Sequence, residues 1–114
     1  MSTFHQDLKR KMDSYVHMVY RLTKRLPKEE QYGLTSQLRR SSLSVILNYI
    51  EGYARMSGKA HRNFLTISYG SLKESKYLLH FCFVEKYIEE DEYEIVNSLA
   101  DDIGAMLWGI IDRL

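Results

Sequence analysis

Cysteine and proline each occur only once in this sequence of 114 residues, and glycine only six times. The lone cysteine, Cys82, excludes an internal disulfide, fits a reducing compartment and is expected to be a small core residue. Few glycines and prolines, together with an aromatic fraction of 12%, exclude a linker-rich or disordered chain. The sequence therefore predicts a single folded domain over residues 1–114, long enough to enclose one core.

Long apolar runs are also missing. The longest uncharged stretches, such as Ser41 to Ile50, reach about ten residues, whereas a membrane-spanning helix needs roughly 20. The opening segment MSTFHQDLKRK has no apolar stretch that would serve as a secretion signal. We therefore expect a cytoplasmic protein with no membrane partner.

Motifs that carry metal or catalytic chemistry are absent as well. No histidine follows a glutamate at the Glu-x-x-His spacing of di-iron bundles, and there is no cysteine pair or His-x-x-x-His pair for a transition metal. The glycines are scattered, so no phosphate-binding loop forms, and no serine has an evident base. We expect no catalytic residue, no cofactor, no metal and no enzymatic activity. An enzyme would need a pocket with perturbed titratable groups around Glu51 and Arg40.

Charge is unevenly distributed along the chain. Residues 1–62 hold 12 Lys and Arg against 5 Asp and Glu, a balance of +7, while residues 63–114 hold 4 against 10, a balance of −6. This asymmetry favours either a basic face for an anionic partner or complementary surfaces that meet in an oligomer, and solvated helix faces are the third alternative.

Apolar residues recur in steps of three and four, which is typical of amphipathic helices. The first stripe is Phe4, Leu8, Met12, Tyr15, Val19, Leu22 and Leu26. Pro27 ends that helix, and Asp91 with Glu94 predicts a capping box at the start of the last one. We predict helices at about 4–26, 33–56, 59–88 and 92–113, and hence an all-α, up-down-up-down four-helix bundle.

The second helix is apolar on two faces. At 100° per residue, one strip is expected to face the bundle core; it contains Leu34, Leu38, Ser41, Val45, Tyr49 and Gly52. The second strip lies nearly opposite and contains Leu43, Leu47, Ile50 and Ala54. A single core cannot cover both strips, so we infer a subunit interface; tolerated surface aliphatics are the alternative.

A polar seam separates these strips and is interpreted as a structural hydrogen-bond and ion-pair network. Glu51 and Arg55 have the favourable order for an ion pair along one helix. Arg39 projects from the apolar side and needs a carboxylate or solvent, with Glu74 as one candidate partner. The candidate structural polar residues are Arg39, Arg40, Asn48, Glu51, Gly52 and Glu74.

The third helix repeats the two-sided design. One face carries Ala60, Phe64, Ile67, Ser71, Ser75, Leu78 and Cys82, and a second stripe carries Leu65, Leu72, Leu79 and Phe83. Two such helices strengthen the expectation of a homo-oligomer. The candidate interface residues are Leu43, Leu47, Ile50, Leu65 and Leu72.

Basic residues gather on the first helix, at its exit and around the second connection. Such a patch, repeated in an oligomer, would make many salt-dependent phosphate contacts, and exposed tyrosines would stack on single-stranded bases. The candidate nucleic-acid-binding residues are Lys9, Arg10, Lys11, Arg21, Lys24, Arg25, Lys28, Arg55, Lys59 and Arg62. RNA, DNA and acidic protein partners all fit this pattern.

Three motifs resemble a known family over nearly the whole chain. They are Glu-x-Tyr-Gly-Leu-Thr-Ser-Gln-x-Arg-Arg at Glu30–Arg40, Asn-x-x-Glu-Gly at Asn48–Gly52 and Gly-Ser-Leu-x-Glu at Gly70–Glu74. They are similar to those of the four-helix-bundle proteins of 23S ribosomal RNA intervening sequences, which are related to the accessory variability determinant of diversity-generating retroelements.

The resemblance implies a homopentameric ring and, from the retroelement proteins, an accessory role beside a reverse transcriptase with nucleic-acid binding. Our leading hypothesis from the sequence is therefore a non-enzymatic, ring-forming adaptor that binds nucleic acid or a nucleoprotein partner through its basic surface. The alternative is a protein-directed oligomeric scaffold with no nucleic-acid role.

Overall fold

The computed structural model describes residues 3–114, and most of these residues belong to four α-helices. They are α1 (Thr3–Thr23), α2 (Leu34–Ala54), α3 (Gly58–Val84) and α4 (Glu90–Asp112), and the 3-10 helix η1 (Lys28–Glu30) lies between the first two. The first two residues of the predicted 1–114 domain lie outside the described residues. No strand occurs within residues 3–114.

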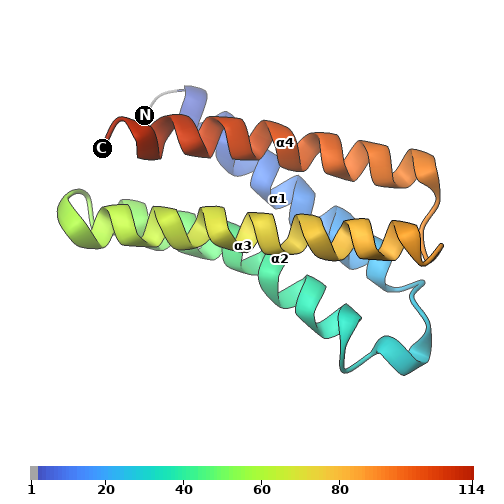
Figure 1. Ribbon diagram of the computed structural model, residues 1–114. Helices are drawn as coiled ribbons and strands as arrows, with labels where there is room; N and C mark the ends of the chain where they lie inside the picture. The colour runs from blue at the N-terminus through green and yellow to red at the C-terminus, as the bar shows by residue number, and fades with distance from the viewer. Residues whose placement is uncertain (1–2) are drawn as a thin grey trace.

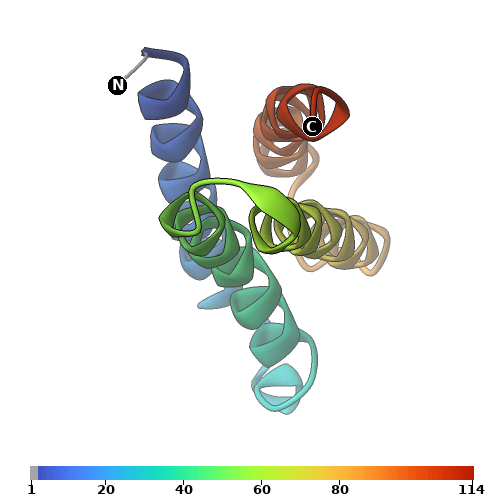
Figure 2. The ribbon, with the colours of Figure 1, turned by 90° about the vertical axis from the view of Figure 1, so that its left-hand side faces the viewer.

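The helices reverse direction at each connection, so both chain ends lie at the same end of the molecule (Figure 1). Helix α1 packs against α2 and α4, and α3 packs against the same two helices. This closes a four-helix arrangement 42 Å long, as the predicted all-α bundle requires. Seen from the end that holds the termini, α3 and α4 are nearly end-on, whereas α1 and α2 lie beside them and are inclined to the view (Figure 2).

The core follows the helical periodicity of the sequence. Helix α1 buries Leu8, Met12, Tyr15, Val19 and Leu22 on one face, as the spacing predicts. Helix α2 buries the whole of its predicted core strip, which comprises Leu34, Leu38, Ser41, Val45, Tyr49 and Gly52. Helix α4 contributes Val96, Ala100, Ile103, Leu107 and Ile111. Burial of these side chains supplies the main driving force for folding.

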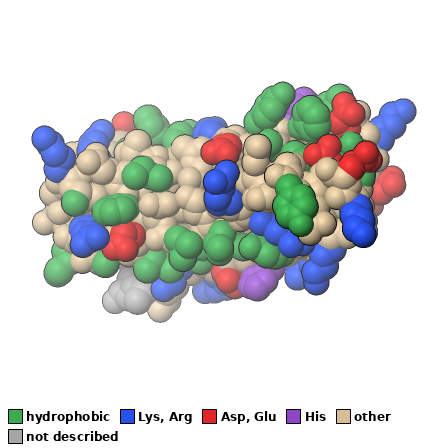
Figure 3. Space-filling view, turned by 90° about the horizontal axis from the view of Figure 1, so that it is seen from below, with side chains coloured by type: hydrophobic (Ala, Val, Ile, Leu, Met, Phe, Trp, Pro, Cys, Tyr) green, Lys and Arg blue, Asp and Glu red, His purple; other side chains and the backbone are tan. Residues whose placement is uncertain are grey.

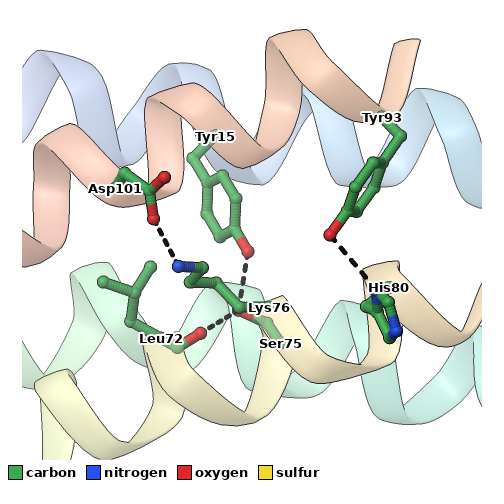
Figure 4. A network of polar contacts seen from close by, with 7 residues as sticks. All are labelled: Tyr15, Leu72, Ser75, Lys76, His80, Tyr93 and Asp101. Atoms are coloured by element: carbon green, nitrogen blue, oxygen red, sulfur yellow. Dashed lines mark hydrogen bonds and ion pairs between the residues drawn. The ribbon is translucent and has the colours of Figure 1, made fainter. Parts of the chain in front are cut away.

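Hydroxyl groups tie the helices together inside this core (Figure 4). The Tyr15 hydroxyl of α1 lies 2.7 Å from Ser75 Oγ of α3, and Ser75 Oγ donates to the Leu72 carbonyl at 2.9 Å. Ser68 Oγ of α3 donates to the Val45 carbonyl of α2 at 2.6 Å. These bonds satisfy the buried serines, which would otherwise destabilise an apolar interior.

The face of α3 that enters the core differs from one sequence expectation. Leu65 and Leu72 are 0% exposed, so they cannot belong to the surface that we expected to meet a second subunit. Serines at positions 68 and 75 lie beside them because each hydroxyl finds a partner in a neighbouring helix. The outward face of α3 instead exposes Ile67.

Two helices end earlier than the periodicity indicates. Helix α1 ends at Thr23 and not at residue 26, because the N–H groups of Arg25 and Leu26 turn back to the carbonyls three residues earlier. Helix α3 ends at Val84 and not at residue 88. Lys86 has a φ of 64°, and the Tyr87 N–H bonds to the Cys82 carbonyl at 2.8 Å, which is a Schellman termination.

Helix α4 begins earlier than predicted and with a different cap. Glu89 occupies the cap position, and the Glu92 carboxylate accepts a hydrogen bond from the Glu89 backbone N–H at 3.1 Å. The capping box is therefore Glu89 with Glu92 and not Asp91 with Glu94. Both pairs have the same spacing, and only the path of the preceding turn decides between them.

Helices α2 and α3 approach closely at Gly52. A Cβ at this position would lie 3.0 Å from Leu65 Cδ2, so a side chain there would force Leu65 to shift. His61 Nδ1 donates to the Gly52 carbonyl at 2.7 Å, which joins the last turn of α2 to the first turns of α3. Packing between the two helices therefore explains the glycine at this place.

Candidate nucleic-acid interface

A groove runs between α1 and α2 on the outside of the bundle. It consists of three hollows of about 530, 570 and 250 Å³. The first two share Asp13 and Ile46 in their walls, and the second and third share Lys9. The hollows therefore form one continuous feature, which we call the α1–α2 groove.

The α2 wall of this groove is apolar. Leu43, Ile46 and Ile50 line it, at steps of three and four residues along one flank of the helix. Seen from below, the molecule shows hydrophobic side chains gathered along this side, with basic and acidic side chains between them (Figure 3). Two residues of the strip that we expected to meet another subunit, Leu43 and Ile50, thus form the wall of a groove.

The α1 wall supplies cations. Lys9, Arg21 and Lys24 line the groove, and none of the three forms an ion pair with any carboxylate in residues 3–114. Asp13 also lines the groove, but its carboxylate lies 3.5 Å from His17. Lys9 and Lys24 are separated by 15 positions, or roughly 22 Å along a helix. The groove therefore presents positive charge over most of the length of α1.

Two basic residues, Lys11 of α1 and Arg25 just beyond its end, pair with carboxylates of α4. Lys11 lies 3.8 Å from Asp102, and Arg25 lies 2.5 Å from Glu92. The Arg25 guanidinium lowers the pKa of the Glu92 carboxyl. Helix α4 contains seven acidic residues and no basic one, so part of the charge asymmetry between the two halves of the sequence is compensated within the chain itself.

Most of the remaining candidates lie away from the groove or are paired. Arg10 lines the groove but pairs with Asp7 at 3.4 Å, and Arg55 pairs with Glu51 at 3.1 Å. Lys59 and Arg62 line a separate hollow beside the α2–α3 connection, and Lys28 belongs to η1. The ten basic residues grouped by sequence thus fall into at least three separate places.

Arg39 has partners other than the one we considered from the sequence. Its guanidinium lies 4.7 Å from the centre of the Tyr20 ring, and its Nε donates to Thr23 Oγ1 at 2.9 Å. Both partners lie on α1, so Arg39 fastens α2 to α1 beside the groove. Glu74 is exposed on α3 and makes no ion pair within the described chain.

The polar seam of α2 faces α3. Ser44 Oγ lies 2.7 Å from Ser71 Oγ, and the Asn48 amide donates to the Ser44 carbonyl at 2.9 Å and to Ser44 Oγ at 2.8 Å. Arg40, in contrast, is exposed and makes no hydrogen bond or ion pair among the residues that the structure describes. The contacts of Ser44 and Asn48 are those of a helix-packing network.

Chemical reactivity is not evident at these positions. Cys82 is buried, and burial raises the pKa of its thiol to about 11, which leaves it protonated and unreactive. Within residues 3–114, no group of three or more His, Cys, Asp or Glu side chains is arranged to hold a metal ion. None of the helices in that range is long and apolar enough to cross a membrane.

The sequence reasoning missed the aromatic residues of the groove. Tyr20 lines the hollow beside Lys24, and Tyr49 and Tyr53 line the hollow at the other end. The spacing of four residues between Tyr49 and Tyr53 on α2 is the signal for this, but periodicity places Tyr49 on the core strip and Tyr53 on neither apolar strip. Tyr49 belongs to both, since its ring is buried while its hydroxyl reaches His5.

Comparison with known proteins places these features in context. A model of the 23S rRNA-intervening sequence protein family matches residues 5–109. The chain is similar to the 1.70 Å crystal structure of a protein with unknown function from the S23 ribosomal protein family of Bacteroides thetaiotaomicron VPI-5482. The TM-score is 0.87 and the identity 25%, over 96% of this chain and 99% of that chain. A search of curated proteins found no match.

Proposed function

The chain belongs to the family of 23S rRNA-intervening sequence proteins, and on that basis we propose that it is a non-enzymatic adaptor that binds nucleic acid in the α1–α2 groove. It acts in the cytoplasm as a homo-oligomeric ring. In the second form of this proposal, the bound partner is a nucleoprotein such as a reverse transcriptase. That form rests on the resemblance to the retroelement proteins.

One observation carries the nucleic-acid proposal. Lys9, Arg21 and Lys24 line a single groove and have no carboxylate partner among the described residues. Cations without partners lose no ion pair when they meet phosphate. Each phosphate contact releases counterions, so three contacts to a single strand predict a slope of log K against log salt of roughly −2.

Self-association is assigned to the outward side of α2 and α3. Leu47 is 53% exposed and lies outside the groove, and Ile67 of α3 is 49% exposed. Leu47 and Ile67 lie at a similar height along the bundle. Ser68, the residue after Ile67, donates to the carbonyl of Val45, which precedes Leu47 by two residues. A neighbouring subunit on this surface would cover apolar side chains and leave the groove open.

A binding experiment tests the proposal. Fluorescence anisotropy with labelled RNA and DNA, single-stranded and duplex, is measured over a range of salt concentrations. The variant Arg21→Glu with Lys24→Glu is expected to weaken binding strongly. The matched control is Lys73→Glu with Arg113→Glu, which changes the net charge equally at exposed sites on α3 and at the C-terminus. Absence of binding at low salt, or equal loss in both variants, would contradict the proposal.

A protein-directed scaffold remains the second candidate function. The specific observation in its favour is the acidic α4, whose pairing with α1 shows that the two surfaces are complementary in charge. If subunits were held by the same complementarity, light scattering would show dissociation as salt rises. An assembly held by the apolar residues of α2 and α3 would keep its mass.

A further inference from the structure

The hollow at the N-terminal end of the groove differs from the other two in its lining. It has a volume of about 250 Å³ and is lined by His5, Lys9, Tyr49, Ile50 and Tyr53. Three of these five side chains are aromatic rings, and no carboxylate of residues 3–114 contributes to the wall. Lys9 also lines the adjoining hollow, so a strand lying in the groove passes directly into this pocket.

The rings of this pocket are held in place by one another. His5 Nδ1 lies 2.7 Å from the Tyr49 hydroxyl, and the Tyr53 ring lies 4.7 Å from His5 and 5.0 Å from Tyr49. On its other side Tyr53 contacts His61 edge to face at 4.9 Å, and His61 is anchored to the Gly52 carbonyl. The pocket is therefore built before a ligand arrives, which lowers the entropic cost of binding.

Charge in the pocket is positive only. Burial raises the pKa of both Tyr49 and Tyr53, so both phenols stay neutral at physiological pH. Lys9 is the one lysine or arginine in the wall and forms no ion pair with the described carboxylates. A ligand with a flat apolar ring and an attached anion matches this combination of surfaces.

We propose that this pocket receives one unstacked base of a single strand, with the adjoining phosphate at Lys9. The inference rests on the proposed nucleic-acid role of the groove and adds a substrate class, since a base in a duplex must first unpair to enter. A volume of 250 Å³ lies below the range of about 300–1,000 Å³ for drug-sized sites, and a single base is correspondingly small. Base–aromatic contacts typically strengthen binding by roughly five- to a hundredfold per base.

Abasic strands separate this inference from the proposed function. A single strand of about 12 nucleotides, within the site sizes of single-strand binding proteins, is compared with an abasic strand carrying the same phosphates and with a duplex of equal length. The base-bearing strand is expected to bind at least about fivefold more tightly than the abasic strand. Equal affinity for the two strands would overturn base binding in the pocket but would leave nucleic-acid binding in the groove intact. If no strand binds at all, both proposals are overturned.

Two substitutions locate the effect in the pocket. Ile50→Trp fills the hollow from an exposed position and is expected to remove the preference for the base-bearing strand over the abasic strand. Tyr53→Ala removes a ring and is expected to do the same. The matched control for the first is Ile95→Trp, also at an exposed isoleucine, on α4. Circular dichroism melts verify folding, and a base preference that survives in both variants overturns the inference.

Discussion

The direction of the hydrogen bond between buried Tyr15 and Ser75 predicts which of two substitutions lowers the free energy of unfolding more. Ser75 Oγ donates its only proton to the Leu72 carbonyl at 2.9 Å. Tyr15 must therefore be the donor in the 2.7 Å contact between its hydroxyl and Ser75 Oγ. Both residues are fully buried, so water cannot replace either partner; Figure 4 shows the contact between them.

The two deletions have different costs for this reason. Tyr15→Phe removes the donor and leaves Ser75 with its acceptor on Leu72, so the loss is that of one hydrogen bond, about 0.5–1.5 kcal/mol. Ser75→Ala leaves a buried phenol donor without an acceptor, which costs about 1–3 kcal/mol; the better helix propensity of alanine offsets roughly 0.5 kcal/mol of it. The double variant leaves neither group unpaired, so its cost should fall below the sum by about 1 kcal/mol.

Urea unfolding of the four proteins followed by circular dichroism measures this coupling. The change in helix propensity caused by Ser75→Ala is the same with and without Tyr15→Phe, so it cancels in the cycle. A coupling energy near zero, with the two single costs simply adding, would refute the assignment of Tyr15 as a donor to Ser75. Thermal melts should give the same order of stability.

Three further outcomes follow from the structure. Above pH 10 the free energy of unfolding should fall, because burial raises the pKa of Tyr15 and the unfolded chain loses that proton first; Tyr15→Phe should make the fall shallower by up to about 1.4 kcal/mol per pH unit, and an unchanged slope in an alkaline urea titration would contradict this. Gly52→Ala should destabilise by up to about 2 kcal/mol, because crowding of the new Cβ 3.0 Å from Leu65 costs about 1–3 kcal/mol and the gain in helix propensity offsets about 1 kcal/mol. Gly70→Ala, with nothing within 4 Å, should stabilise by up to about 1 kcal/mol; equal melting shifts would show that packing at Gly52 is loose. Leu47→Asp should dissociate the proposed oligomer in light scattering while far-ultraviolet circular dichroism stays unchanged, and an unaltered mass would place the proposed subunit contact elsewhere.

Helix positions were predictable because the pattern of apolar residues is local information. The stripe on α1 and the core strip of α2 both follow from a repeat of three and four residues. The structure buries them except for Phe4, which is 41% exposed at the start of α1. Helix ends were less predictable. The end of α3 depends on a lysine at a φ of 64°, a conformation for which sequence reasoning looks to glycine.

The sequence could not show which face of α3 enters the core, because α3 carries apolar residues on more than one face. On α3, Leu65 and Leu72 formed one stripe and Ser75 with Cys82 another, and the structure buries members of both. A serine in a core is acceptable only where a partner accepts or donates a hydrogen bond, and that partner lies on another helix. Periodicity does not contain these partners, so it wrongly places Leu65 and Leu72 at a subunit interface.

The sequence by itself determined the four-helix architecture, the core strip of α2 and the excess of basic residues in the first half of the chain. Tertiary structure alone decided which of those basic residues have partners: α4 neutralises Lys11 and Arg25, while Lys9, Arg21 and Lys24 line a groove and form no ion pair with a described carboxylate. Periodicity reports the faces of each helix separately. Pairing of charges across helices depends on distances between segments far apart in the chain, which periodicity does not contain.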